Sequence, residues 1–369
     1  MIRRIGRALS QNHTPLIQVI PYRKTLWGLT ALVLTFAAIS CDRGRKEAER
    51  KAIEEAKADS IARREAFVRD SIEAERNRPL TAEDITVEKA FLFEDYKLDD
   101  SYPYKDTVRV IKWDKIKAEL AVIENVQKDK HTWGVLQNYK NLNREAPVVH
   151  NWHRNEYKLV SDSLNIARYQ SAPLYRLPDT ITPRRYGRDG TLIVFRDSIG
   201  SFYRLSLYNS DEEWAVPKRY VHFIPDTAAF YHAVFVDRSD QNIVTMERSE
   251  KGKWLVRSTN PCTTGKHNPP YQQETPLGTF LLQQKKVKMF YTHDGSSRLA
   301  GYAPYASRFN NGGYLHGVPT NNVKGKIIEW SWSLGTTPRS HMCVRNASSH
   351  AKFIFDNFPT EETLVVVID

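Results

Sequence analysis

A cysteine with two histidines upstream is the part of this sequence with the clearest chemical potential. Cys343 lies two residues after His341, and His316 stands further upstream. A thiol attacks only as its thiolate, so a catalytic cysteine requires a nearby base or a positive electrostatic environment. Asn346 is a good N-cap for a helix expected over Ala347–Phe358, which predicts that the thiol lies near the positive end of a helix dipole. These residue types therefore predict nucleophilic catalysis by Cys343.

The residues around this cysteine resemble the signature of the L,D-transpeptidases, the penicillin-insensitive cysteine enzymes that cross-link peptidoglycan. The family motif is a His followed by Ser/Thr-His-Gly-Cys-apolar-Arg/Asn, and this chain matches it at His316, Ser340, His341, Cys343, Val344, Arg345 and Asn346. The chain departs from the motif at Met342, where the family usually has glycine, and in a spacer between His316 and Ser340 that is longer than usual. The extra length, around Val323–Trp332, is expected to form a surface hairpin with a Lys324-Gly325-Lys326 turn, which leaves both ends in place.

The resemblance implies a role for each residue of the motif. Cys343 is the nucleophile, and His316 is the base, with its second ring nitrogen held by a backbone carbonyl, that of Gly317. His341 faces the oxyanion together with backbone N–H groups near Met342 and Cys343.

The remaining candidates are expected to hold the substrate. Arg345 is placed to bind the carboxylates of a peptide stem, and Ser340 is expected to support the His341 ring and the loop. Met342, Asn346 and Tyr314 complete this set. Tyr314 ends an aromatic, glycine-punctuated segment, Phe290–Tyr314, which either covers the substrate channel as a flap or packs on the domain as a loop.

The same three side chains admit a metal-binding alternative. His316, His341 and Cys343 would suffice as three zinc ligands with water as the fourth. The family resemblance gives each of them another role, and it implies neither a metal nor a cofactor.

The sequence from 230 to 369 predicts a mostly-β catalytic domain with one helix after Cys343. The resemblance implies a β-sandwich, and two further segments, Thr263–Lys266 and Thr275–Phe280, are similar to segments of the family. In the Thr-Pro-x-Gly-x-Phe turn, the fixed φ of proline and the permissive φ of glycine are enough to explain the residue types. We therefore interpret this turn as scaffold. The strands are expected at Ala233–Asp237, Asn242–Arg248, Lys253–Arg257, Gly278–Leu282, Ile327–Trp332 and Leu364–Ile368.

Two smaller regions precede the catalytic domain, which makes the chain multidomain and mainly β. Residues 166–226 resemble a bacterial SH3-like barrel, with strands expected at 167–175, 190–195, 202–207 and 213–217. Such a module either binds the cell wall, positions the catalytic domain or is purely structural. Residues 81–165 are expected to be α-rich, with apolar residues at helical spacing over Asp114–Val126.

The N-terminus has the features of an export signal. Cations without acids precede the apolar run Thr25–Ser40, which ends in small residues before Cys41, so residues 1–40 are interpreted as a signal peptide. Ala38–Cys41 resembles a lipoprotein box, which implies a lipid on Cys41 and anchoring at a membrane; an ordinary signal peptide or a signal anchor is the alternative. Residues 41–80 have too few apolar positions for a core and are expected to form a solvated helical or partly disordered stalk. The expected location is the cell envelope or periplasm.

Composition argues against a disulfide-rich fold and against nucleic-acid binding. Three cysteines do not make a disulfide scaffold, and Cys262 is left over, although a bond between Cys262 and Cys343 would silence the enzyme. Without the five cations of the signal, the formal charge of +11 becomes +6. No basic block with interleaved aromatic residues suggests nucleic-acid binding. The oligomeric state is not defined by the sequence.

The expected function is transfer between peptidoglycan stem peptides. Cys343 would form an acyl-enzyme with a tetrapeptide stem, release D-Ala and pass the acyl group to an amine of a neighbouring stem. The resemblance also implies acylation by carbapenems. Water as the acceptor would make an L,D-carboxypeptidase, and the same acyl-enzyme would serve an enzyme that attaches or releases a wall-linked protein. A hypothesis of another class is a non-catalytic peptidoglycan-binding lipoprotein, which Met342 and the long spacer favour.

Overall fold

The computed structural model describes residues 27–138, 153–154, 160–161, 171–268 and 271–369. The first 26 residues of the expected signal lie outside these ranges, and so does the side chain of Cys41. The chain divides into two compact units, Met1–Arg78 and Pro79–Asp369, which are taken in turn.

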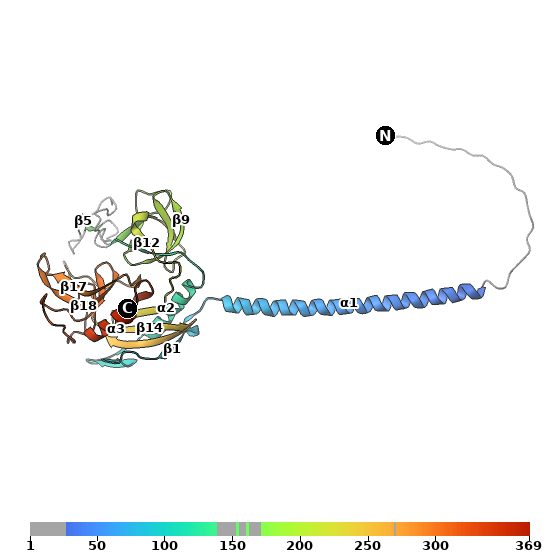
Figure 1. The fold of residues 1–369 in the computed structure, drawn as a ribbon, viewed down its shortest axis with the longest axis horizontal. Coiled ribbons are helices and arrows are strands. Elements are labelled where there is room, and N and C mark those ends of the chain that lie inside the picture. The colour runs from blue at the N-terminus through green and yellow to red at the C-terminus, as the bar shows by residue number, and fades with distance from the viewer. Residues whose placement is uncertain (1–26, 139–152, 155–159, 162–170, 269–270) are drawn as a thin grey trace, which may run out of the picture. The chain divides into compact units, whose positions relative to one another are not determined.

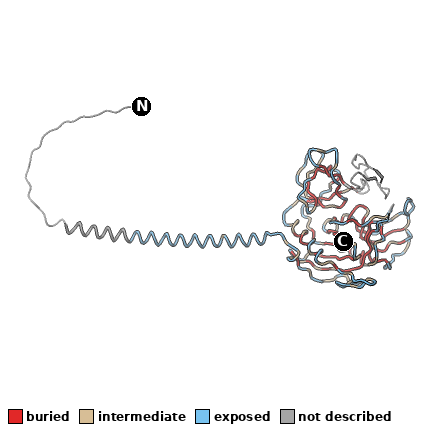
Figure 2. The backbone as a smooth tube through the Cα atoms, turned by 180° about the vertical axis from the view of Figure 1, so that it is seen from behind, coloured by how far each residue is buried: buried red, intermediate tan, exposed pale blue. Residues whose placement is uncertain are grey.

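The first unit contains one long helix, α1 (Trp27–Asn77) (Figure 1). From Arg43 onward almost every side chain of this helix is exposed, as Figure 2 shows. Ion pairs one turn apart, such as Arg63 Nη2 to Asp59 Oδ2 at 2.6 Å, add modest support on its surface. Of the two forms expected for the stalk, the helical one is found. Within the ranges that the structure describes, no helix combines the length and the apolar character needed to cross a membrane.

A six-stranded sheet forms the centre of the second unit. Its strands β13 and β21 run parallel, and their side chains alternate between two cores. Val234 and Val236 enter one core, whereas Ala233 and Phe235 enter the other. Burial on both faces explains why Leu364–Ile368 is an uninterrupted apolar run. In sheet order the strands are β1 (Thr86–Lys89), β15 (Lys253–Pro261), β14 (Asn242–Glu250), β13 (His232–Asp237), β21 (Thr363–Ile368) and β16 (Gly278–Leu281).

Helix α2 (Trp113–Val126) covers one face of this sheet and lies where the apolar spacing predicted a helix. Its buried Glu124 accepts hydrogen bonds from Arg248 Nε at 2.7 Å and Trp254 Nε1 at 3.0 Å, which fixes the helix on the sheet.

The expectation that residues 81–165 are α-rich is wrong for the part of this range that the structure describes, in which α2 is the one α-helix. Strand β1 pairs with β15, about 170 positions away in sequence. A strand stabilised by so distant a partner need not show a local pattern of apolar residues. The other described elements before residue 165 are η1 (Ala82–Asp84), β2 (Ser101–Tyr104), β3 (Thr107–Val110), β4 (Trp133–Leu136), β5 (His153–Arg154) and β6 (Val160–Ser161).

The opposite face of the six-stranded sheet packs against a second sheet and helix α3 (Ser348–Asn357), which confirms the mainly β sandwich with a helix after Cys343. Most of residues 290–314 lie in paired strands of this second sheet, joined by turns at 293–298 and 311–312, so the segment expected as a flap or a loop is a hairpin with a further strand. Its strands are β17 (Gln284–Thr292), β18 (Leu299–Asn310), β19 (Gly313–His316) and β20 (Val344–Arg345).

The long spacer after His316 does not form the expected hairpin. It contains a turn in which Gly325 N donates to Asn322 O at 3.0 Å, and a single bridge joins Val318 to Ile328. The strand expected at 327–332 is absent from this described stretch. The backbone there instead binds the start of α3, because Ser348 Oγ donates to Ile328 O at 2.6 Å.

A separate five-stranded sheet precedes the catalytic region, and two of its strands coincide with the predicted ranges 202–207 and 213–217. One strand, β4, comes from before residue 166. The SH3-like assignment stays a prediction. In sheet order the strands are β11 (Glu213–Pro217), β10 (Phe202–Leu207), β9 (Leu192–Ile199), β4 and β12 (Val221–Phe223), with η3 (Lys218–Tyr220) before β12 and the hairpin β7 (Ser171–Leu174) and β8 (Arg185–Arg188) bridged to β11.

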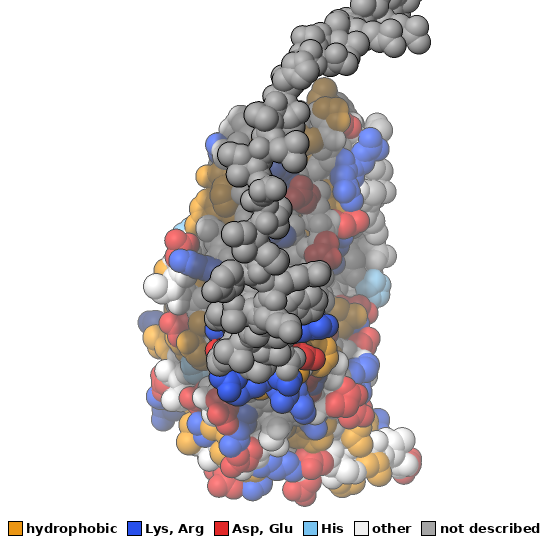
Figure 3. Space-filling model, turned by 90° about the vertical axis from the view of Figure 1, so that its right-hand side faces the viewer, with side chains coloured by type: hydrophobic (Ala, Val, Ile, Leu, Met, Phe, Trp, Pro, Cys, Tyr) orange, Lys and Arg blue, Asp and Glu red, His pale blue; other side chains and the backbone are white. Residues whose placement is uncertain are grey.

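The charged side chains are mixed on the surface. On the face that Figure 3 shows, Lys and Arg side chains alternate with Asp and Glu among the described residues. The described charges visible on this face are therefore of mixed sign.

Candidate active site

The pairing of β19 with β20 brings the predicted site residues together. These strands run parallel, with Leu315 opposite Val344 and His316 opposite Arg345. Because successive side chains of a strand point to opposite faces, Leu315 and Val344 enter the core. Cys343 and Arg345 therefore share the other face with His316 and Tyr314.

Cys343 sits in a small apolar cluster with Ala306 and Tyr314, and 8% of its surface is exposed. Its thiol donates to the carbonyl of Gly312 with an Sγ–O distance of 3.3 Å. In the strand register Gly312 lies two positions before Tyr314, and His316 lies two positions after it. The resting thiol hydrogen thus points along β19 away from the candidate base. Cys343 and Cys262 are not joined to each other, so the disulfide considered from the sequence is not formed.

His316 is buried, with 3% of its surface exposed. Its Nδ1 lies 2.6 Å from the carbonyl oxygen of Gly317, the contact that the family resemblance implies. A hydrogen bond from Nδ1–H to this carbonyl leaves Nε2 as the unprotonated nitrogen. Burial lowers the pKa of His316 to about 4. The imidazole is therefore neutral near pH 7 and is able to accept a proton.

The loop before Cys343 differs from the expected arrangement. Ser340 Oγ donates to the carbonyl of Cys343 and not to the His341 ring. His341 is exposed, and its Nε2 lies 3.0 Å from Asp294 Oδ1, in the turn between β17 and β18. Ser340 therefore supports the backbone of the loop, as expected, but the expectation that it also supports the His341 ring is wrong, because its hydroxyl is used for the loop.

Met342 adopts a backbone conformation that favours glycine. Its φ is 91°, which costs a residue with a side chain about 1–3 kcal/mol. Thr275 supports this conformation, since its Oγ1 donates to Met342 O at 2.8 Å and accepts from Gly265 N at 2.8 Å. A Cβ on Gly265 would lie 2.7 Å from Met342 Cα. The Thr-Pro-x-Gly turn is thus scaffold, as interpreted from the sequence, and the structure shows that it holds the catalytic loop.

Arg345 supplies the positive charge beside the thiol. Its backbone pairs with Thr263, at 2.8 and 2.9 Å, on the side of β20 away from β19. Burial lowers the pKa of Arg345 below its ordinary value, whereas negative charge on Cys343 acts in the opposite direction. A guanidinium remains charged at neutral pH. Its Nε has no hydrogen-bond partner among the side chains that the structure describes, so this cation has donor capacity for a ligand.

The start of helix α3 differs from the first expectation, in which Asn346 is the N-cap. Helix α3 begins at Ser348 with Ala347 as its N-cap, and the cap makes no side-chain hydrogen bond. Glu329 binds the first N–H groups, since Ser348 N donates to its carbonyl at 3.0 Å and Ser349 N to its carboxylate at 3.1 Å. Asn346 instead donates to Val344 O at 3.2 Å.

Three residues expected to contact substrate are enclosed in the fold. Tyr314, Ser340 and Asn346 each expose 2% of their surface or less. Their side chains pack beneath the loop that carries Cys343, where they support its position. A motif does not show whether a residue supports the loop or contacts the substrate, because residues of either kind place polar groups close to the reacting atoms.

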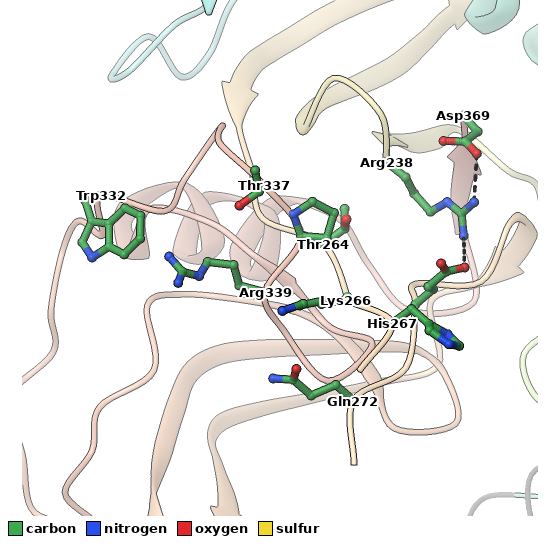
Figure 4. Close-up of a pocket in the computed structure, with 12 residues that line it drawn as sticks. Arg238, Thr264, Lys266, His267, Gln272, Trp332, Thr337, Arg339 and Asp369 are labelled. Atoms are coloured by element: carbon green, nitrogen blue, oxygen red, sulfur yellow. Dashed lines mark hydrogen bonds and ion pairs between the residues drawn. The ribbon is translucent and has the colours of Figure 1, made fainter. Parts of the chain in front are cut away.

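A cavity of about 810 Å³ lies beside the catalytic loop (Figure 4). Lys266 and Arg339 line it and are joined to the loop through their backbones, because Lys266 N donates to Ser340 O and Arg339 N to Thr264 O, both at 2.9 Å. The Arg339 guanidinium lies 4.2 Å from the centre of the Trp332 ring. Arg238 is bound by Asp369 and Glu274. Cys343 and His316 do not line this cavity, and the motif gave no signal for Arg339 or Trp332.

Comparison with known proteins confirms the family resemblance for the C-terminal region. Residues 231–367 match the family described as YkuD: L,D-transpeptidase catalytic domain. The Bacillus subtilis (strain 168) protein YciB, whose name assigns it provisionally to the L,D-transpeptidases, is 34% identical over 94 residues, which are 25% of this chain and 46% of that protein. The chain thus spans about half the length of this curated relative.

Solved L,D-transpeptidases are similar at lower identity. An L,D-transpeptidase from Mycobacterium smegmatis is 17% identical with a TM-score of 0.30, over 54% of this chain and 77% of that chain. L,D-transpeptidase 3 from Mycobacterium tuberculosis, solved with a faropenem-derived adduct, is 16% identical with a TM-score of 0.30, over 54% of this chain and 78% of that chain.

Proposed function

We propose that this protein is a peptidoglycan L,D-transpeptidase that forms an acyl-enzyme on Cys343. The observation that carries the proposal is the common face of β19 and β20, on which a nucleophile, a neutral buried imidazole and a cation lie together. Acyl transfer by a thiol requires these groups and donors for the oxyanion. The family match at 231–367 supports the same chemistry.

In the first step, the Cys343 thiol gives its proton to His316 Nε2, and Sγ attacks the carbonyl carbon of the diamino acid in a tetrapeptide stem. The amide bond to the terminal D-Ala breaks, and the leaving amine takes the proton from His316. In the second step, a side-chain amine of a neighbouring stem attacks the thioester and loses a proton to the same imidazole. Sγ leaves and is protonated again. The two protons are thus returned through one residue.

Arg345 has two uses in this scheme. Its charge would stabilise the thiolate, and the attraction by which Cys343 acts to raise the pKa of Arg345 supports this use. Its unpartnered Nε also suits a carboxylate of the stem peptide through a charge-assisted hydrogen bond. The proposed oxyanion donors are the backbone N–H groups near Met342 and Cys343, with His341 at the rim of the site.

The products formed from tetrapeptide muropeptides test the proposal. Purified protein is expected to convert disaccharide tetrapeptides into cross-linked dimers with release of D-Ala, as measured by chromatography and mass spectrometry. Tripeptides without dimers would show that water is the acceptor and that the protein is a carboxypeptidase. If a folded protein forms neither product and Cys343→Ala binds sacculi as well as the wild type, the non-catalytic binding hypothesis replaces the enzyme.

Anchoring through Cys41 is a second part of the proposal. Acyl chains on this residue contribute about 0.8 kcal/mol per buried CH₂, so the wild-type protein is expected to sediment with membranes and Cys41→Ala to appear in the soluble fraction. Fractionation after a high-salt wash, followed by immunodetection, measures this difference. A variant that still sediments would show that the apolar segment 25–40 is itself the anchor.

A further inference from the structure

We infer that Asp189, in the five-stranded module that precedes the catalytic region, is a positioning residue for the nucleophile. It fixes the turn whose carbonyl receives the thiol hydrogen of Cys343. The inference rests on the proposed function in one respect, that Cys343 is the reacting group. It assigns a role in the active site to a residue far outside the 231–367 segment.

Asp189 lies in the turn between β8 and β9 and is fully buried. Its Oδ2 accepts from Arg308 Nη1 at 2.6 Å, from Asn311 N at 2.9 Å and from Gln283 Nε2 at 3.1 Å. Its carbonyl accepts from Asn310 Nδ2 at 2.9 Å. Three of these four donors belong to residues 308–311, so this carboxyl residue binds both the end of β18 and the turn that follows.

The neighbouring Gly190 shows how closely the two parts approach. Its φ is 89°, and a Cβ at this position would lie 2.0 Å from the carbonyl oxygen of Phe309. Its own carbonyl accepts a hydrogen bond from Leu281 N at 2.8 Å. The Asp189-Gly190 turn is therefore fitted against β18 without room for a side chain.

The turn held by Asp189 is the one that contacts the nucleophile. Residues 310–313 join β18 to β19, and Asn311 has a φ of 31°. The next residue, Gly312, accepts the Cys343 thiol at 3.3 Å. Gly312 and His316 lie on opposite sides of the thiol along β19. The position of this turn therefore sets how often the thiol is bonded to Gly312 O and how often it turns toward His316.

The charged surroundings make this arrangement sensitive to Asp189. The titratable groups on the thiol face are His316, Tyr314 and Arg345, with Lys286 Nζ 5.8 Å from the centre of the Tyr314 ring. Arg308 follows on the same face, opposite Tyr314. Removal of the Asp189 charge takes away the carboxylate that pairs with the buried Arg308 guanidinium, which displaces the strand end and the turn.

Alkylation of Cys343 by iodoacetamide as a function of pH tests the inference on the full chain. Peptide-resolved mass spectrometry separates Cys343 from Cys262 and Cys41. In Asp189→Asn the Gly312 carbonyl no longer holds the neutral thiol, so the midpoint of alkylation is expected to fall by about one pH unit. Acylation by a carbapenem is expected to slow about tenfold or more in the same variant, because the nucleophile is no longer oriented.

These opposite changes distinguish positioning from general destabilisation. Buried Cys262 reports on the fold, since local unfolding would make it reactive. Asp197→Asn is the matched control, because Asp197 pairs with Arg204 on the surface of the same module and is expected to change neither rate. If Asp189→Asn exposes Cys262, Gln283→Ala decides the question. This variant removes the bonds of Gln283 to Asp189, to Phe309 O and from Arg308 Nη2, but it keeps the ion pair between Asp189 and Arg308. Gln283→Ala is expected to lower the alkylation midpoint and to slow acylation, each by less than Asp189→Asn does.

Unchanged alkylation and acylation in a folded Asp189→Asn variant would overturn the inference. The proposed function fails separately. If wild-type protein forms no acyl adduct and no muropeptide product while the alkylation midpoint still moves in Asp189→Asn, the enzyme assignment is lost and the positioning of the thiol stands.

Discussion

Incubation with a carbapenem is expected to add one drug mass to the wild-type protein, and Cys343→Ser is expected to abolish the adduct. The thiolate bonds to the β-lactam carbonyl carbon, the ring C–N bond breaks, and the ring nitrogen takes the proton. A serine hydroxyl in the same place lacks thiolate character at neutral pH, so the rate should fall below detection. Intact-protein mass spectrometry measures the adduct, and peptide mapping locates it.

Cys262→Ser is the matched control for this experiment. Cys262 is fully buried, and burial raises its pKa well above the ordinary value, so it is held as the neutral thiol. The adduct should form on this variant at the wild-type rate. Labelling of Cys262 in the folded wild-type protein would contradict the assignment of the nucleophile.

Replacement of His316 by Gln is expected to slow acylation of Cys343 by about 10²–10⁴-fold, the usual contribution of a general base. The glutamine amide keeps a donor for the Gly317 carbonyl but offers no basic nitrogen. Because the pKa of His316 is about 4, the wild-type imidazole is neutral at neutral pH and loses its function only as the pH falls through that value. Stopped-flow measurement of β-lactam ring opening gives the rates.

His350→Gln separates loss of the base from loss of a buried histidine. His350 is also fully buried, and burial lowers its pKa to about 3. It contacts Ser258 Oγ at 2.8 Å in the core behind α3. Its replacement should affect thermal stability more than acylation. The defect of His316→Gln should also shrink at alkaline pH, where hydroxide removes the thiol proton. Equal rates for His316→Gln and wild type at neutral pH would show that another group is the base.

The candidate reactive groups of this protein could be predicted from its sequence, because such groups are specified by residue type. Cys343, His316 and Arg345 were predicted from their motif, and the structure places them on one face. The contact between His316 and Gly317 was likewise implied by the family resemblance. Strands with local apolar alternation, such as β10 and β11, were predicted with correct limits.

Features that depend on distant partners were not readable. The strand expected at 327–332 has apolar and aromatic residues but no neighbouring strand, so its backbone binds α3 instead. Asn346 has the residue type of an N-cap, yet Glu329 from the long spacer binds the first N–H groups of α3. A side chain of the type that caps helices does not bind the first N–H groups when another acceptor lies closer to them.

The sequence by itself indicated which residues are the candidates for the chemistry and where several of the strands lie, because both follow from side-chain type and local spacing. Tertiary structure alone decided that the thiol points to Gly312, that Thr275 holds the strained Met342 loop and that Asp189 holds the neighbouring turn. Each of these contacts joins atoms that are tens to more than a hundred positions apart. Their energies depend on distances of about 3 Å, which only the packing of whole sheets against one another sets.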